Sequence, residues 1–154
     1  MDFNYGQVEA ALATACEVTP KAIGAFRARL RHLRNLGLPR LPKPGSGKHI
    51  SYTERQALEM MMAVLLENHG YAARKAMLVA QSIVRQSPPY YGQHRGGDCF
   101  VLIDRPDSPS YVVALGHRAL AKALKSRSAL FLVINVSTYA RKLDDALDRA
   151  PATG

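Results

Sequence analysis

The sequence predicts an α+β protein, with a mainly α-helical N-terminal half and a small ββαβα unit at the C-terminal end. Over residues 7–86, apolar side chains recur at helical spacing, and capping residues mark where helices begin and end. Over residues 99–154, short apolar runs alternate with turn residues and helical segments. We therefore expect a helical domain over 1–86, a linker over 87–98 and a small α+β unit over 99–154.

The composition excludes several classes of protein. The chain has 154 residues, of which 47% are hydrophobic, enough for a folded core. No apolar run approaches the roughly 20 residues that span a bilayer, and the N-terminus lacks the pattern of a signal peptide. Two cysteines, Cys16 and Cys99, are too few for a disulfide scaffold or a cysteine-type zinc site. We therefore expect a cytoplasmic protein without a membrane partner.

Positive charge is concentrated in one segment. The net charge is +9, and residues 19–55 hold nine cations and one anion, Glu54, a net charge of +8. The other 117 residues are nearly neutral. A solvated helix face would also produce such a run, but this segment carries recognisable structural signals. A polyanionic partner is therefore the stronger interpretation.

Two helices are expected in the first quarter of the chain. The first covers residues 7–16, and the second covers 20–36 with Thr19 as its N-cap. Gly37 and Pro39 then end the second helix. Each helix carries an apolar stripe, formed by Val8, Ala11, Leu12 and Ala15 in the first and by Ile23, Phe26, Leu30 and Leu33 in the second.

The join between these helices resembles a bacterial helix-turn-helix. The stretch Leu12-Ala13-Thr14-Ala15-Cys16-Glu17-Val18-Thr19, with Ile23 four residues on, matches the pattern Leu-Ala-x-x-x-Gly-Val-Ser followed by Ile or Val. Ala13 is small enough for two helices to cross closely, Val18 fills the turn and Ile23 anchors the second helix. Glu17 stands where the family usually has a glycine in the left-handed conformation, so this residue should be strained.

The next segment predicts a basic turn. Residues 38–52 are rich in glycine and proline, and residues 48–52 alternate as a short strand does. Gly45-Ser46-Gly47-Lys48 is not a Walker A loop, because that motif needs a first glycine where Pro42 stands and a hydroxyl residue where His49 stands. Thr53, with Gln56 three residues on, begins a helix that ends near Gly70, and a further helix is expected over 71–86.

The order of these elements resembles the winged helix-turn-helix of the MerR-like family over residues 7–86. The resemblance is carried by Gly37-Leu38-Pro39 after the second helix, by the basic turn in the place of a wing, and by Tyr52-Thr53 at the start of the next helix. It implies that the second helix enters the major groove of DNA and that Lys43 to Ser51 form a wing on the backbone or minor groove. The second helix is longer than is usual in the family.

The outward face of the second helix combines small side chains with cations. Gly24, Ala25 and Ala28 would let the helix approach a groove closely, while the cations reach phosphates or guanine edges. The alternative is that these small residues pack against another part of the protein. The candidate DNA-binding residues on the helix and wing are Thr19, Lys21, Arg27, Arg31, His32, Arg34, Asn35, Lys43, Ser46, Lys48 and His49.

The C-terminal unit is expected to contain strands over 99–103, 111–115 and 130–135, a helix over 117–126, and a last helix capped by Ser137. A unit this small cannot bury much surface alone, so it packs on the first half or pairs with a second copy. By analogy with other DNA-binding proteins, a dimerisation or effector role is expected.

No catalytic or metal site is predicted. The five histidines form no H-x-x-x-H pair, and no Ser/His/Asp or paired-carboxylate arrangement is visible. Cys16 and Cys99 are expected to be buried structural thiols. The last helix is expected to hold solvated ion pairs between Asp144, Asp145 and Asp148 and the cations Arg141, Lys142 and Arg149. We therefore expect neither an enzyme nor a cofactor.

The sequence thus predicts a sequence-specific regulator of transcription, of bacterial or prophage type, that binds duplex DNA. It would be nucleoid-associated and act as a homodimer on inverted repeats. One alternative is a phage-type architectural or DNA-packaging factor with the same fold. The other is an adaptor that contacts RNA polymerase through the helix with Met60-Met61-Met62 and the C-terminal unit.

Overall fold

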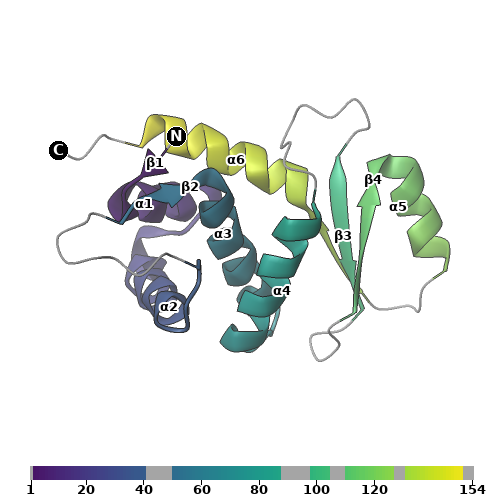
Figure 1. Cartoon of the computed structure of the whole chain (residues 1–154), viewed down its shortest axis with the longest axis horizontal. Helices are drawn as coiled ribbons and strands as arrows, with labels where there is room; N and C mark the ends of the chain where they lie inside the picture. The colour runs from purple at the N-terminus through teal and green to yellow at the C-terminus, as the bar shows by residue number, and fades with distance from the viewer. Residues whose placement is uncertain (1, 41–49, 88–97, 105–109, 127–130, 151–154) are drawn as a thin grey trace.

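The long axis of the molecule has most of its helices at one end and a three-stranded sheet at the other (Figure 1). The structure, a computed structural model, describes residues 2–40, 50–87, 98–104, 110–126 and 131–150. These residues form an α+β fold, mostly helical, with six α-helices and two small antiparallel sheets. The predicted α+β class is confirmed. No helix within the described ranges has the length and apolar character needed to cross a membrane.

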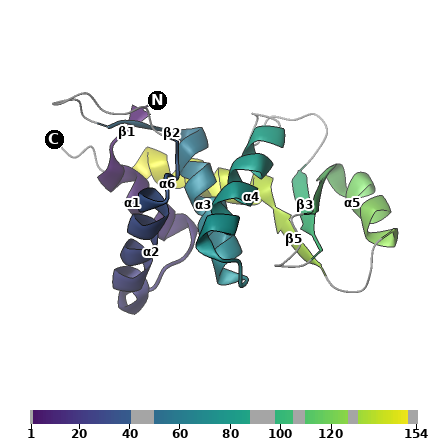
Figure 2. The same cartoon turned by 60° about the horizontal axis from the view of Figure 1, so that its bottom comes forward.

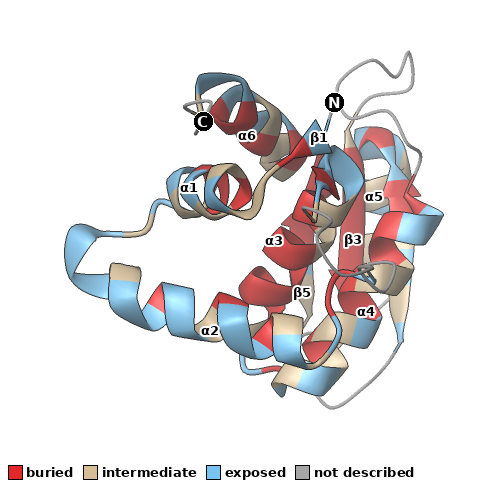
Figure 3. Ribbon diagram, turned by 60° about the vertical axis from the view of Figure 1, so that its left-hand side comes forward, coloured by how far each residue is buried: buried red, intermediate tan, exposed pale blue. Residues whose placement is uncertain are grey.

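The helical end is built from the first 86 residues. Its elements are β1 (Asp2–Phe3), α1 (Tyr5–Ala15), the 3₁₀ helix η1 (Pro20–Ala22), α2 (Ile23–Asn35), β2 (Tyr52–Thr53), α3 (Glu54–Asn68) and α4 (Ala73–Gln86). α3 is buried on nearly all sides (Figure 3), so the other helices pack around it. β1 pairs with β2 and ties the N-terminal segment to the start of α3.

The helix starts show where capping signals were decisive. Asn4 and Gln7 form a capping box in which each side chain bonds the other's backbone N–H (3.0 Å), so α1 begins before the predicted residue 7. The predicted capping box of Thr53 and Gln56 at α3 is confirmed.

The predicted helix over 20–36 is wrong at its start. The Thr19 side chain makes no capping hydrogen bond. The backbone carbonyl of Thr19 instead accepts from the N–H of Ala22 (2.9 Å). This tight bond winds residues 20–22 as a 3₁₀ turn, so the α-helix begins only at Ile23.

The predicted strand over 48–52 is also corrected. Ile50 and Ser51 are not in a strand, and pairing with β1 is limited to Tyr52 and Thr53 because β1 has only two residues. The wing predicted over 43–51 otherwise lies outside the described residues.

The rest of the described chain holds the predicted ββαβα succession, whose last helix returns to the helical end. Its elements are β3 (Cys99–Ile103), β4 (Tyr111–Leu115), α5 (Gly116–Lys125), β5 (Leu132–Asn135) and α6 (Val136–Arg149). The strand order is β4-β3-β5, with both pairings antiparallel. One face of the sheet, with Val101 and Ile103, joins the main core, and α5 covers the other face over Phe100 and Leu102.

The predicted cap of α6 is wrong. The side chain of Asn135, not Ser137, accepts the N–H of Thr138 (3.0 Å) and begins the helix. Ser137 is buried, and its hydroxyl accepts the N–H of Cys99 (2.8 Å). It therefore joins α6 to the first residue of β3.

The main hydrophobic core runs from the helical end to one face of the sheet. α6 leaves the sheet and packs along α1 and α3 (Figures 1 and 2), so that Leu143 and Leu147 lie in one cluster with Val8 and Leu12. The core therefore includes residues from both sides of the segment 87–98, which the sequence predicts to be a linker between two domains.

Candidate nucleic-acid interface

Residues 16–19 form a tight turn between α1 and η1. Glu17 adopts the left-handed conformation (φ 55°), the conformation that the sequence predicted for this position. The N–H of Val18 then donates to the carbonyl of Ala13 (2.9 Å), which closes the turn. The carboxylate of Glu17 accepts from the ammonium of Lys142 on α6 (2.6 Å), an exposed ion pair that links the turn to the last helix.

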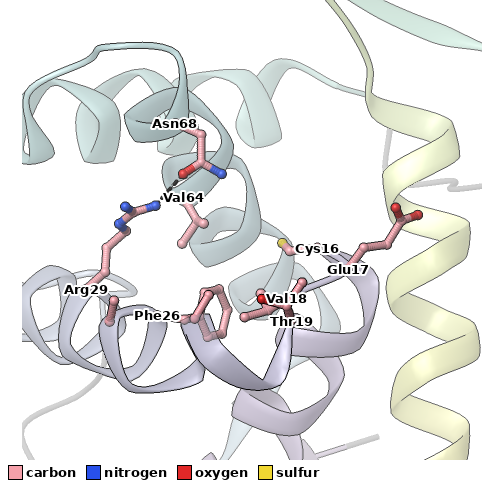
Figure 4. Close-up of a pocket in the computed structure, with 10 residues that line it drawn as sticks. Cys16, Glu17, Val18, Thr19, Phe26, Arg29, Val64 and Asn68 are labelled. Atoms are coloured by element: carbon pink, nitrogen blue, oxygen red, sulfur yellow. Dashed lines mark hydrogen bonds between the residues drawn. The ribbon is translucent and has the colours of Figure 1, made fainter.

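A cavity of about 300 Å³ lies between this turn, α2 and α3 (Figure 4). Phe26 and Val64 form apolar walls, and the guanidinium of Arg29 donates to the side-chain oxygen of Asn68 across one side. Arg29 also lies 3.8 Å from the carboxylate of Glu67. These contacts fix one flank of α2 against the C-terminal end of α3.

Cys16 lines the same cavity and is a protonated thiol. Burial raises the pKa of this thiol to about 11, and the positive charge of Lys142 offsets only part of the increase. Burial likewise raises the pKa of the Cys99 thiol. Because the thiolate is the reactive form, neither side chain is a nucleophile at neutral pH.

The opposite flank of α2 is held by α1. Arg27 pairs with the carboxylate of Glu9 (2.7 Å), and the guanidinium of Arg34 lies over the ring of Tyr5, 4.0 Å from its centre. Arg27 and Arg34 were both candidates for DNA contact, and the structure gives each an intramolecular partner. Glu9 and Tyr5 were not singled out in the sequence; their spacing of four residues along α1 is the only signal that they share a face.

The remaining face of α2 is exposed. Its apolar stripe is buried in the core through Phe26, Leu30 and Leu33, so the residues on the other side of the helix meet solvent. A side chain placed at Gly24 would meet no described atom within 4 Å. The exposed residues of the helix and the turn before it include Thr19, Lys21, Gly24, Ala25, Ala28, Arg31, His32 and Asn35.

The structure therefore brings together part of the predicted set. Lys21, Arg31, His32 and Asn35 share the exposed side of η1 and α2, and no side-chain hydrogen bond or ion pair joins them to other described residues. The predicted wing residues Lys43, Ser46, Lys48 and His49 lie outside the described residues. Gly24 and Ala28 are exposed, and a side chain placed at Gly24 would meet no described atom within 4 Å, whereas Ala25 lines the cavity beside α3. The alternative explanation, that the small residues pack against another part of the protein, therefore does not hold for Gly24.

The acidic residues of α6 behave differently from the prediction. Arg141 pairs with Asp98 (3.0 Å) and Lys142 pairs with Glu17. Both partners lie outside α6, so these two cations do not form the predicted ion pairs within the helix. Asp144 is partly buried near Glu54, and burial, followed by the negative charges around it, raises its pKa to about 6. In the part of the chain that the structure describes, no three acidic, histidine or cysteine side chains could hold a metal ion.

Comparison with models of known protein families and with curated proteins finds no match to this chain.

Proposed function

We propose that the protein binds duplex DNA and that α2 enters the major groove. The observation that carries this proposal is the exposed face of α2 and η1, where Lys21, Arg31 and Asn35 stand among small residues. Small side chains let a helix lie deep in a groove, and arginine, lysine and asparagine are the side chains that pair with base edges and phosphates.

The surroundings of this face support the same role. α2 contains no acidic residue, so nothing on the helix itself repels phosphate. Its flanks are fixed by Glu9 and Tyr5 on one side and by Asn68 on the other. A recognition helix gains affinity when it is held rigidly in advance, because less conformational entropy is lost on binding.

The finer proposals rest on the sequence. The resemblance to MerR-like regulators, the basic segment over 43–51 and the helix-turn-helix pattern support a homodimeric bacterial or prophage-type transcription regulator, with the wing as a second contact. The adaptor alternative loses its main support, because Met60, Met61 and Met62 are fully buried and cannot form a docking surface.

A gel shift on fragments selected from genomic DNA tests the proposal. Arg31→Ala should weaken binding to the selected site by about 1–3 kcal/mol and reduce sequence preference, since one base or phosphate contact is lost. Arg74→Ala removes an equally exposed cation from α4 and is the matched control, with an expected change below about 0.5 kcal/mol.

The salt dependence of the same gel shift provides a second readout. The logarithm of the binding constant should fall with the logarithm of salt concentration, with a slope of roughly −0.9 for each phosphate contacted. Equal affinities of the Arg31→Ala and wild-type proteins, or a binding constant that does not respond to salt, would refute the assignment of α2.

A further inference from the structure

A second concentration of positive charge lies in the C-terminal unit. From Ser108 to Leu143 the sequence has six cations and no acidic residue. Arg141 and Lys142 are used in ion pairs with Asp98 and Glu17. The other four cations are Arg118, Lys122 and Lys125 on α5, and Arg127, which is outside the described residues.

The packing of α5 directs Arg118, Lys122 and Lys125 to solvent. The apolar side of the helix, formed by Ala119, Leu120, Ala123 and Leu124, lies on the sheet against Phe100 and Leu102. Arg118, Lys122 and Lys125 are spaced by four and three residues and therefore line one exposed side of the helix. No carboxylate in the described ranges pairs with any of them, and the exposed Ala121 between them is small.

This cationic side of α5 faces away from α2. In Figures 1 and 2 the two helices lie toward opposite ends of the long axis, with α3 and α4 between them. The sheet lies on the inner side of α5, so its cations point away from the helical end of the molecule. The exposed side of α2 and the cations of α5 therefore belong to separate surfaces of the molecule.

We propose that α5 binds the phosphate backbone of a second DNA segment, so that the protein bridges two duplexes. This inference rests on the proposed function of α2. Three aligned cations without a carboxylate partner among the described residues suit a regular array of phosphates, and contacts to phosphate need no base sequence. A lipid surface suits the helix less well, because a helix that lies in a membrane interface needs a free apolar side and α5 uses its own against the sheet.

A two-duplex capture assay tests the bridge. A biotinylated duplex with the selected site is immobilised, protein is added, and retention of a fluorescent duplex of unrelated sequence is measured. The α5 variant is Arg118→Gln/Lys122→Gln/Lys125→Gln. The matched control is Arg74→Gln/Lys75→Gln/Arg85→Gln, which removes the same charge from α4.

The wild-type and α4-variant proteins should retain the fluorescent duplex. The α5 variant should retain at least tenfold less, while its affinity for the immobilised site stays within threefold and circular dichroism reports an unchanged fold. Equal retention by the α5 variant would overturn the proposal, since a homodimer bridging through two copies of α2 would give that result. Absence of retention by the wild-type protein would overturn it as well.

Two further arms separate this proposal from others. An Arg31→Ala protein that binds the selected site with wild-type affinity disproves the role of α2, yet a loss of retention in the α5 variant would still identify α5 as a DNA-binding face. Vesicles of phosphatidylserine and phosphatidylcholine test the lipid alternative. Binding to vesicles that depends on the α5 cations, without capture of the second duplex, would contradict the bridge.

Discussion

Arg31 and Arg34 stand three residues apart on α2 and meet different surroundings. Arg34 lies over the ring of Tyr5, while Arg31 is exposed and has no partner among the described residues. The apolar stripe of α2 correctly predicts which side of the helix faces the core. It cannot predict that Tyr5 of α1 contacts Arg34, because that depends on how the two helices cross.

Glu17 shows a residue whose conformation could be predicted. The resemblance to a helix-turn-helix placed a left-handed residue at this position, and the structure has φ 55° there. The partner of the Glu17 side chain, Lys142, lies 125 residues further along the chain. Local sequence patterns contain no information about such a pairing.

Asp144 makes stability depend on pH. Its pKa is raised from the ordinary 3.8 to about 6, so the folded state binds a proton more tightly than the unfolded state. Ionisation of Asp144 therefore destabilises the folded protein; this cost is present in full above about pH 6 and is relieved as pH falls from about 6 towards 3.8. Because the side chain is partly exposed, Asp144→Asn should stabilise the protein by only about 1 kcal/mol at neutral pH.

Urea unfolding at two pH values measures this effect. The advantage of Asp144→Asn should be present at about pH 7.5 and should shrink near pH 5, where the wild-type carboxyl is protonated. Asp145→Asn, at the exposed neighbouring position, is the control and should change stability by less than about 0.5 kcal/mol. A constant advantage at both pH values would exclude titration of Asp144 as its cause.

Among the elements, the helices and the longer strands were predictable, and the shortest ones were not. Helices such as α3 and α4 carry apolar stripes and clear end signals, and the runs that form β3 and β4 are uninterrupted. β1 has two residues and no periodicity, and it exists only because β2 pairs with it. The 3₁₀ start of α2 was missed since Thr19 has the sequence of a cap without making the capping bond.

The proposed role of α2 predicts that a large side chain on its exposed face blocks DNA binding without affecting folding. Ala28 is exposed, so Ala28→Tyr should change stability by less than about 0.5 kcal/mol. The added ring would hold the helix away from the groove floor, and affinity for the selected site should fall by about 2 kcal/mol or more. Binding is measured by gel shift and stability by thermal unfolding.

Ala10→Tyr is the matched control for this change. Ala10 is equally exposed but lies on α1, so the same ring there should leave affinity within about threefold, or roughly 0.6 kcal/mol. If both tyrosine variants bind DNA as the wild-type protein does, the exposed face of α2 is not in a groove.

At the scale of the whole molecule, the two ends share one core. Leu143 of α6 lies in one cluster with Leu12 of α1 and Val101 of β3, although these residues are far apart in sequence. The sequence predicted that the C-terminal unit packs on the first half or pairs with a second copy, and the core shows the first of these. The choice could not be made from local patterns, because the apolar stripe of α6 would suit either partner.

The charge distribution on the folded molecule differs from the one along the sequence. The residues outside 19–55 are nearly neutral in total, so their net charge does not predict a cationic surface. In the structure no described carboxylate pairs with Arg118, Lys122 or Lys125, and these cations line one exposed side of α5. The net charge of a segment therefore does not predict its charged surfaces, because a helix in a nearly neutral segment can carry its cations along one exposed side.

Guanine methylation interference on the selected site tests the central claim, that α2 enters the major groove, most directly. Methylation of N7 places a methyl group on the major-groove edge of guanine, where an arginine or lysine would bind. The account predicts that methylation at defined guanines blocks the wild-type protein, and that at least one such position ceases to matter for Lys21→Ala or Arg31→Ala. Wild-type binding that is unaffected by methylation at every guanine of the site would contradict it.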